Sequence, residues 1–458
     1  MGSKSSKLFK EEKIGKLLLR FSIPIIIAFL ISELYNMVDT VFVGNYVGPL
    51  GIGALVLVFP IQRIIFAIGI MIAIGSSTTF SRELGRRNTE NAIKVVNNGL
   101  SFSLGLMTIL TFAVYLFKEK ILLLMGASPD ILPYAMEYLG GIIFGSVFLC
   151  LTIFISNIMI SLGNNKLSII TNSIGAITNI VLNYILVVNF KMGVTGAAIA
   201  TTVSQIIGFS YGFYKFIRVA KENNINLKLE LDQRIIIPVI TVGLSAFVVE
   251  AEDGILMAVL NNLLANTVGD SGIVVLGVIS KLYMFLFITM FGIASAMQPI
   301  AAYNMGAKNY RRLKSLMKKT TLYAFLTSVV LWTFMMIFAP QLISIFVKEQ
   351  TIIAESVKAF RIMISVFPII SVYYVSIYYF QAMGKAKTSL MVCLLRQIAI
   401  MIPLSIILVK GFNMGAMGVW LSYPIADILS SLLSYMLIRN EGMELGIIIE
   451  KQGREKLA

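Results

Sequence analysis

The sequence predicts an all-α membrane protein in which twelve transmembrane helices form two pseudo-symmetric six-helix lobes around a central cleft. Three observations lead to this prediction. Hydrophobic residues make up 57% of the 458-residue chain, charged residues make up 13%, and the mean hydropathy is +0.86. This composition excludes an ordinary soluble protein, in which about 25% of the residues are charged. The other two observations are the apolar runs and an internal repeat.

Twelve apolar runs approach the length of about 20 residues that a helix needs to cross a bilayer. Six fall in each half of the chain. Because an even number of spans returns the chain to its starting side, we expect parallel repeats related by an axis along the membrane normal. The runs begin near Leu17, Gly53, Val95, Pro133, Leu167 and Thr195, and then near Ile235, Gly272, Thr320, Val357, Ser389 and Ala416.

The two halves resemble each other at an offset of about 221 residues, too long a period for a solenoid. The segment from Pro24 to Asn88 matches the segment from Ser245 to Asn309. The pairs include Gly48 with Gly269, Gly85 with Gly306 and Gly163 with Gly384, and one residue is inserted in the second half near Lys410. In an apolar chain, such a repeat indicates two homologous bundles of the transporter type.

The basic residues give the expected orientation in the membrane. About 25 of the 38 Lys and Arg residues lie in alternate connections and at the two ends, in segments 1–20, 81–94, 215–234, 304–319 and 439–458. By the positive-inside rule, both termini are expected in the cytoplasm and the protein in the plasma (inner) membrane. The net charge of +15 is therefore not interpreted as a nucleic-acid surface, which needs one contiguous basic face.

These patterns predict five segments and no soluble domain. An interfacial segment (1–16) precedes the N-lobe (17–217), and a polar linker (218–234) leads to the C-lobe (235–438) and a short tail (439–458). Because one chain supplies both lobes, we expect a monomer embedded in the lipid bilayer.

Residues that commonly carry catalysis are scarce. The chain has no His and two Cys, both within apolar runs, so neither a metal framework nor a disulfide framework is indicated. No nucleophile arrangement, Gly-rich phosphate loop or channel-filter motif is present. We therefore expect neither an enzyme nor a bound cofactor, and any proton coupling has to use carboxylates.

Asp39 is the leading candidate for a functional side chain, because ionisable residues inside membrane spans are costly. Asn36 precedes it by one turn on the same helix face. Loss of water favours the protonated carboxyl, whereas an approaching cation favours the ionised form, so this group is suited to exchanging a proton for a cation. The alternative is a structural hydrogen bond to a neighbouring helix.

The fifth and sixth runs add polar groups. Asn179 and Asn183 are four residues apart and lie on one helix face, where two carboxamides can bind an ion or water. The sixth run opens with small residues that permit close helix approach, and Thr201 offers a hydroxyl ligand. Taken singly, each of these residues is also explained by contacts between helices.

Three fragments carry a resemblance to a known family: VDTVFVGN around Asp39, the run Asn179 to Asn183, and GAAIAT ending at Thr201. Over nearly its whole length the chain resembles the multidrug and toxic compound extrusion (MATE) family of the multidrug/oligosaccharidyl-lipid/polysaccharide superfamily. The resemblance implies that Asp39 is the coupling carboxylate and that the other groups surround it. Tyr138 resembles a family tyrosine that lines the same lobe.

The family implies coupling to H⁺ or Na⁺, with Na⁺ held at Asp39, Asn179, Asn183 and Thr201. One departure bears on this choice, since the family often has aspartate where this chain has Asn183. A site with one carboxylate fewer is a weaker cage for a hard cation. Proton coupling is therefore favoured, and Na⁺ coupling stays open.

The seventh run is unusually acidic, with Glu250, Glu252 and Asp253 within one turn. Glu250, Asp253 and Met257 share a helix face, whereas Glu252 points elsewhere. Some family members couple through an acidic residue here, and Asp253 matches that position best. We interpret the shared face as a substrate site or a second cation site, with structural ion pairs as the alternative.

Four basic residues also fall within apolar runs: Arg63, Lys281, Arg361 and Arg396. Salt bridges or snorkelling to the interface explain such residues, and Glu252 is a candidate partner for Lys281 or Arg396. If several of these bases instead faced the central cleft, the substrate would be an anion. This pattern would favour a flippase for lipid-linked oligosaccharides.

The sequence therefore predicts a secondary active antiporter that exports amphipathic organic cations in exchange for protons or Na⁺. Its two lobes alternate in access to the two sides of the membrane. The alternative is the lipid-linked oligosaccharide flippase of the same superfamily.

Overall fold

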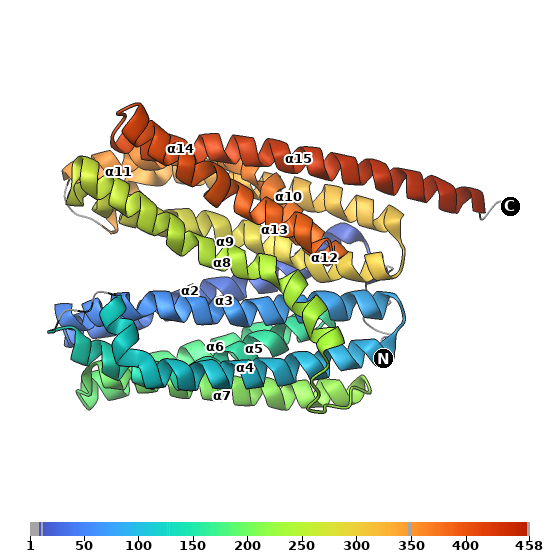
Figure 1. Ribbon diagram of the computed structural model, residues 1–458, viewed down its shortest axis with the longest axis horizontal. Helices are drawn as coiled ribbons and strands as arrows, with labels where there is room; N and C mark the ends of the chain where they lie inside the picture. The colour runs from blue at the N-terminus through green and yellow to red at the C-terminus, as the bar shows by residue number, and fades with distance from the viewer. Residues whose placement is uncertain (1–8, 11, 126, 128, 347–349, 456–458) are drawn as a thin grey trace. The chain divides into compact units, whose positions relative to one another are not determined.

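The computed structural model describes residues 9–10, 12–125, 127, 129–346 and 350–455, and these residues contain helices but no strand. The first half contains α2 (Ile14–Tyr46), α3 (Pro49–Gly85), α4 (Thr89–Leu124), α5 (Leu132–Ser161), α6 (Asn165–Asn183), the π-helix η1 (Tyr184–Asn189) and α7 (Gly193–Glu222) (Figure 1). The second half contains α8 (Gln233–Val268), α9 (Asp270–Gly306), α10 (Tyr310–Ser344), α11 (Gln350–Met363), the 3₁₀-helix η2 (Phe367–Ile370), α12 (Ser371–Met383), α13 (Ala386–Leu394), the π-helix η3 (Leu395–Met401), α14 (Ile402–Ile406), the π-helix η4 (Ile407–Gly411) and α15 (Ala416–Glu455).

The membrane-spanning character of the predicted fold is confirmed. Among the described residues, 11 helices are long and apolar enough to cross a membrane. The pair Gln350–Met363 and Phe367–Met383 makes a twelfth span if it is counted as one, and it is bent by 48°. The break, residues 364–366, lies just before Pro368, whose ring restricts the preceding residue and removes a backbone donor, so a continuous α-helix is disfavoured there.

The internal repeat reappears in the ends of the helices. α3 and α9 begin after Gly48 and Gly269, which both have positive φ, at 96° and 73°. Residues with positive φ are mostly glycine, because it lacks the Cβ atom that clashes there. Asn88 and Asn309 then cap α4 and α10 by accepting a hydrogen bond from a backbone N–H of the first turn. The matched residues thus perform the same local task in both halves.

Two compact units divide the chain. Unit 1 takes the described residues of Met1–Glu12 and Ile23–Phe247, and unit 2 takes those of Lys13–Ser22 and Val248–Ala458. Both α2 and α8 therefore contribute to both units. The predicted lobes, 17–217 and 235–438, were placed from the sequence repeat, and their boundaries differ from those of the two units. The lobes therefore remain predictions.

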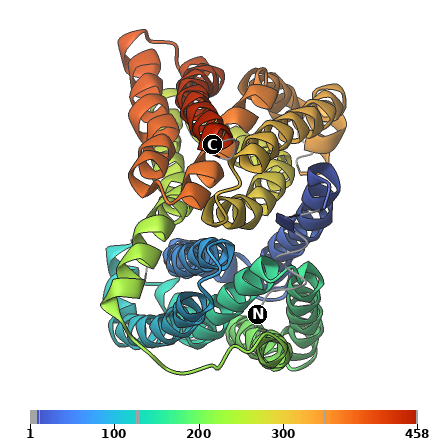
Figure 2. The same ribbon diagram turned by 90° about the vertical axis from the view of Figure 1, so that its right-hand side faces the viewer.

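In unit 1, α5 packs against α3, α4, α6 and α7 (Figure 2). The small residues of the sixth span permit the close approach that the sequence predicted. A Cβ atom on Gly141 of α5 would lie 2.6 Å from the Cβ atom of Ala198 on α7. Thr202 of α7 also donates to the Gly141 carbonyl over 2.8 Å. These contacts fix the spacing of the helices that carry the candidate site.

α3 and the first part of α8 cross within unit 1 with their backbones in contact. A Cβ atom on Gly75 would lie 2.0 Å from the carbonyl oxygen of Val239. A Cβ atom on Gly243 would lie 1.9 Å from the carbonyl oxygen of Met71. Both distances are far below van der Waals contact, so this crossing requires glycine on both helices.

Unit 2 is built around α9, which packs against α10, α11 and α12, while α12 packs against α13 and α15. Aromatic rings fill the space between α9 and its neighbours. The ring centroid of Phe287 lies 4.6 Å from that of Tyr283, 5.3 Å from that of Phe367 and 5.2 Å from that of Tyr374. Edge-to-face pairs of this kind stabilise a buried interface between helices.

Candidate functional site

Asp39 lies about two turns before the end of α2, with only 5% of its surface exposed. Four neutral side chains from three other helices donate hydrogen bonds to its carboxylate. Oδ1 accepts from Asn179 Nδ2 at 3.2 Å and from Asn183 Nδ2 at 2.7 Å. Oδ2 accepts from Thr201 Oγ1 at 2.6 Å and from Tyr138 Oη at 3.3 Å. The structure thus brings together five of the six residues predicted for this site.

The helix geometry explains this convergence. Asn179 and Asn183 lie one turn apart on α6, so both amides point to the same side of the helix. Asn179 Nδ2 also donates to Thr201 Oγ1 over 3.1 Å, which links α6 to α7. Directly after Asn183 the chain passes into η1, and π-helical turns often occur at functional sites.

The charge of Asp39 is not balanced by an ion pair in the part of the chain that the structure describes. Its partners are amides and hydroxyls, which stabilise an ionised carboxylate without neutralising it. The side-chain oxygens of Asn179 and Asn183 are buried and accept no hydrogen bond from the described residues. Buried polar atoms are usually paired, so these two oxygens are available to an ion or a water molecule.

Asn36, the sixth predicted residue, lies on α2 one turn before Asp39. Its side chain is outside the described part of the structure.

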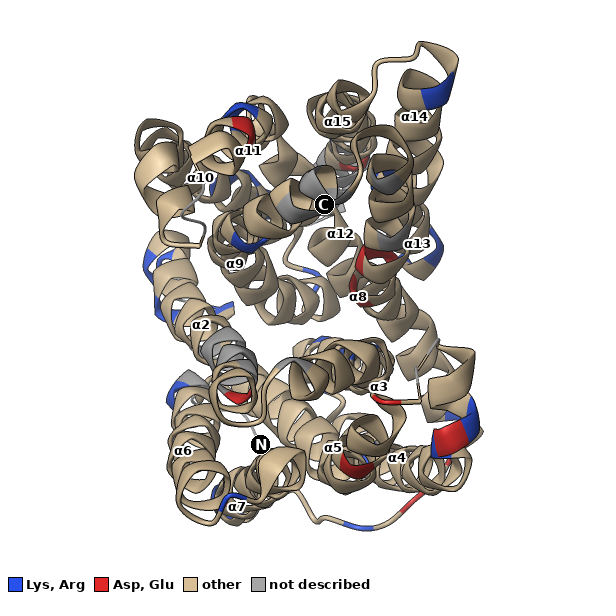
Figure 3. Ribbon diagram, turned by 90° about the vertical axis from the view of Figure 1, so that its left-hand side faces the viewer, with Lys and Arg blue, Asp and Glu red and all other residues tan. Residues whose placement is uncertain are grey.

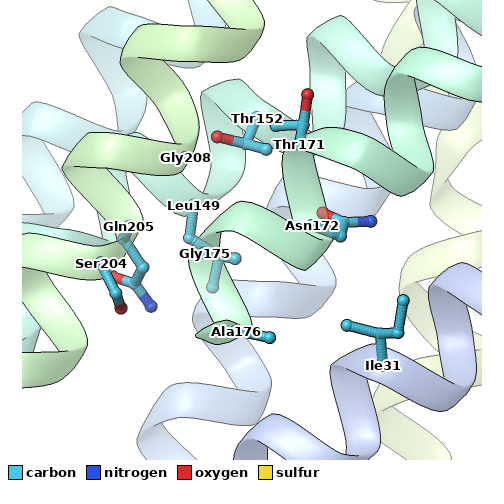
Figure 4. A pocket seen from close by; sticks show the side chains of 10 residues that line it. All are labelled: Ile31, Leu149, Thr152, Thr171, Asn172, Gly175, Ala176, Ser204, Gln205 and Gly208. Carbon is cyan, nitrogen blue, oxygen red and sulfur yellow. The ribbon is translucent and has the colours of Figure 1, made fainter. Parts of the chain in front are cut away.

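A small pocket is lined by residues of unit 1 about one turn from this cluster. It has a volume of about 70 Å³. Its lining includes Asn172 and Gly175 of α6 and Ser204 and Gln205 of α7, and Figure 4 shows these residues around it. Ser204 donates to the Thr201 carbonyl over 2.8 Å, so the pocket begins one turn from the residues that hold Asp39.

The acidic turn of α8 lies in unit 2, and acidic positions on α8 are red in Figure 3. Asp253 is exposed and accepts from Gln397 Nε2 over 2.9 Å. Glu250 is half-buried, and the half-buried Met257 receives a weak hydrogen bond from Ser280 over 3.9 Å. Glu252 is only 3% exposed. It therefore faces a different environment from Asp253, in line with the helix periodicity.

Sequence reasoning missed Asp427, which is fully buried on α15. Its Oδ1 accepts from Arg396 Nε over 2.8 Å, and Arg396 Nη2 also contacts Tyr283 Oη at 3.0 Å. Arg396 is only 2% exposed, so this is a buried ion pair. Asp427 is the one acidic residue of the twelfth apolar run before Glu441, and the rule that singled out Asp39 would also have found it.

The other three intramembrane bases make contacts with aromatic rings and a backbone carbonyl. Arg63 and Lys281 lie over the rings of Phe59 and Phe346, at 5.3 and 5.6 Å from the ring centroids. Arg361 Nε donates to the Met336 carbonyl over 3.2 Å. Arg396, by contrast, forms an ion pair with a buried carboxylate.

Comparison with known proteins gives consistent matches. The MatE family model matches residues 24–185 and 255–407. The multidrug export protein MepA of Staphylococcus aureus (strain NCTC 8325) is 24% identical over 431 residues, which cover 94% of each chain. MepA of Staphylococcus saprophyticus is 24% identical over 433 residues, again with 94% of each chain covered.

Solved structures of similar fold cover almost the whole chain. An outward-facing multidrug resistance MATE family transporter of the MOP superfamily has a TM-score of 0.90 and 24% identity, over 97% of this chain and 99% of that chain. A MOP superfamily transporter from Pyrococcus furiosus has a TM-score of 0.91 and 23% identity over the same shares. At this identity, the likeness establishes a common fold.

Proposed function

Because the chain belongs to the MatE family, we propose that it is a secondary active antiporter that exports amphipathic organic cations in exchange for protons. The fold and the many apolar helices make it an integral multi-pass membrane protein. Members of this family are transporters rather than enzymes, and relatives named for multidrug export match 94% of the chain. What we propose here is the direction of transport, the class of substrate and the coupling ion.

One observation carries the proposal: Asp39 is buried in unit 1, and the described residues that donate hydrogen bonds to its carboxylate are all neutral. An ionised carboxylate in this setting attracts a cation, whereas a bound proton removes the attraction. Substrate and proton therefore compete for the same negative charge. The Thr201 hydroxyl can rotate, so it can donate to the ionised carboxylate and accept from the protonated one.

The driving force is sufficient for useful export. A membrane potential of 100 mV supplies about 2.3 kcal/mol per elementary charge. A tenfold concentration ratio corresponds to about 1.4 kcal/mol. One net charge moved inward per cycle can therefore support a substrate concentration ratio of roughly 50-fold across the membrane.

Two features support a proton over Na⁺ as the coupling ion. The amide nitrogens of Asn179 and Asn183 point at Asp39, so their oxygens face away from the carboxylate that would hold the ion. Asn183 also contributes no charge, and Na⁺ is a hard cation that favours charged oxygen ligands. A Na⁺ site would need Asp39, Thr201 and reoriented amides.

In unit 2, we assign the positive group of the substrate, or a second cation, to the face of α8 that carries Glu250, Asp253 and Met257. Asp253 is exposed and therefore accessible, and the thioether of Met257 offers an adaptable apolar contact. Glu252 is buried and is less suited to contact a substrate directly.

The remaining parts of the proposal concern topology. In unit 1, residues 226–232 of the linker contact the first turns of α4, so the basic segments 81–94 and 215–234 lie at the same end of the helices. We assign this end, and both termini, to the cytoplasmic side of the plasma (inner) membrane. The protein is expected to work as a monomer whose two lobes, 17–217 and 235–438, alternate in access.

The flippase alternative requires bases that are free to hold an anionic head group. Arg396 is neutralised by Asp427, which argues against this role. We therefore retain cation export as the function that the site supports best.

The test is ethidium efflux from cells that express wild type, Asp39→Asn or Asp130→Asn. Asp130 is an exposed carboxylate outside the candidate spans, so its variant is a matched control. We expect efflux by wild type and Asp130→Asn, and loss of efflux in Asp39→Asn. A protonophore is expected to stop wild-type efflux, whereas collapse of the Na⁺ gradient leaves it unchanged.

Each contrary result has a definite meaning. Full efflux by Asp39→Asn removes the coupling role of Asp39. Dependence on the Na⁺ gradient instead reassigns the coupling ion. Absence of efflux by well-expressed wild type for ethidium and other lipophilic cations removes the substrate class and favours the flippase.

A further inference from the structure

We propose that a groove on the surface of unit 1 binds one acyl chain of a membrane phospholipid. The groove has a volume of about 460 Å³ and lies between α4 and α7, over α5. Its lining is apolar and mostly aromatic or leucine, including Leu100, Leu104, Phe112, Phe148, Phe209 and Phe213. Phe112 is 56% exposed and Leu104 is 40% exposed, so the groove is open to the surface at these residues.

The length of the groove matches one leaflet of a bilayer. Its lining on α4 runs from Leu100 to Phe112. At about 1.5 Å per residue this distance is about 18 Å. Half of the hydrocarbon core of a bilayer is about 15 Å thick. A single acyl chain that enters from one side therefore occupies most of the groove before it reaches the midplane.

The linker forms the end of the groove at the membrane surface. Leu229 lines the groove, and the residues on either side of it are bound to α4. The Lys228 N–H donates to Asn97 Oδ1 over 3.2 Å, and the Glu230 N–H donates to Ser101 Oγ over 2.9 Å. These bonds hold Leu229 over the end of the groove. Lys228 is exposed beside it, where its charge can meet the phosphate of the lipid.

The internal repeat provides a comparison within the same chain. In unit 1, Thr111 Oγ1 donates to the Ile143 carbonyl over 3.3 Å. About 221 residues later, Trp332 Nε1 donates to the Ile364 carbonyl over 2.6 Å. The same hydrogen bond is therefore made by a small side chain in unit 1 and by a large ring in unit 2. Because threonine is much smaller than tryptophan, we infer that the same hydrogen bond leaves more room beside α4 in unit 1.

The chemistry of the groove selects an acyl chain rather than a substrate. No charged side chain lines it, and the hydroxyl of Thr111 is already bonded to the Ile143 carbonyl. A cationic drug would find no carboxylate there to balance its charge. An acyl chain gains dispersion contacts on several sides, which an unfilled groove would forfeit. This inference does not depend on the proposed transport function.

The test uses a phospholipid with a photoreactive diazirine on one acyl chain and full-length protein in nanodiscs. Labelled peptides are mapped by mass spectrometry in wild type, Thr111→Trp and Ile109→Trp. Thr111→Trp copies the residue of the second half and fills the groove. Ile109 is 67% exposed on the same helix and does not line the groove, so its variant adds an equal ring without filling it.

We expect stronger labelling of the groove-lining segments of α5 and α7 than of the exposed face of α4 around Leu116. This excess is expected to be lost in Thr111→Trp and kept in Ile109→Trp. If Thr111→Trp does not fold, Val147→Phe fills the groove from α5 and serves in its place. Equal labelling of groove and open surface, or an excess that survives filling, overturns the proposal. Displacement of the label by ethidium would make the groove a substrate site and also overturns it.

Discussion

The two halves of the chain have the same succession of spans but different polar centres. In unit 1, Asp39 is surrounded by Asn179, Asn183 and Thr201. At the repeat offset of about 221 residues, Asp39 corresponds to Leu260. Asn183 corresponds to Leu404, so the position of the carboxylate site is apolar in the second half.

The ion pair of unit 2 is in turn absent from the matched positions of unit 1. Arg396 corresponds to Gly175, and Asp427, after the inserted residue, corresponds to Gln205. Gly175 and Gln205 line the small pocket of unit 1. A buried ion pair in unit 2 therefore stands where unit 1 has a pocket. In unit 2 the charge of Asp427 is neutralised by its partner, whereas Asp39 has no ion-pair partner among the described residues.

The largest effect is expected from breaking the ion pair of unit 2. Arg396→Met leaves Asp427 buried without its partner, which costs about 3–5 kcal/mol of stability. The double variant Arg396→Met with Asp427→Leu removes both charges, and we expect it to recover most of the loss. The measurement is thermal unfolding of the purified protein in detergent. A double variant as unstable as the single one would show that unit 2 needs the charges themselves.

The architecture could be predicted from the sequence because hydropathy and the repeat report on it directly. The repeat located matched turns such as Gly48 and Gly269, whose positive φ the structure reproduces. The break near Pro368 was not placed, because proline is tolerated in many membrane helices and the sequence does not show which one bends.

The candidate site could be predicted in part. Asp39 was identifiable because a carboxylate in an apolar span is costly, and the resemblance supplied its neighbours. The pairing of Arg396 with Asp427 was not predicted, since their contact depends on how α15 packs against η3. The groove was also missed, because the exchange of Thr111 for Trp332 has meaning only once their shared hydrogen bond is known.

A smaller effect is expected from weakening the unit 1 site without removing its charge. Thr201→Val deletes the shortest hydrogen bond to Asp39. A hydrogen bond to a charged group contributes about 1.5–3 kcal/mol, so we expect the apparent affinity for ethidium to fall about tenfold to hundredfold. The measurement is the concentration dependence of initial efflux rates. Thr201→Ser keeps the hydroxyl and is expected to behave like wild type. Equal losses in both variants would point to packing on α7 rather than to the hydrogen bond.

The smallest effect concerns a feature that the two halves share. Asn88 accepts from the Asn91 N–H over 3.2 Å, and Asn309 accepts from the Arg312 N–H over 3.3 Å. Replacing either cap by alanine is expected to cost about 1 kcal/mol, whereas glycine costs only a few tenths. Asn88→Ala and Asn309→Ala are therefore expected to lower the unfolding temperature by similar amounts. A clear difference between them would mean that the halves have diverged in stability at their turns as well as in their polar centres. Equal shifts would confine the divergence to the helix interiors, where Asp39 and Arg396 lie.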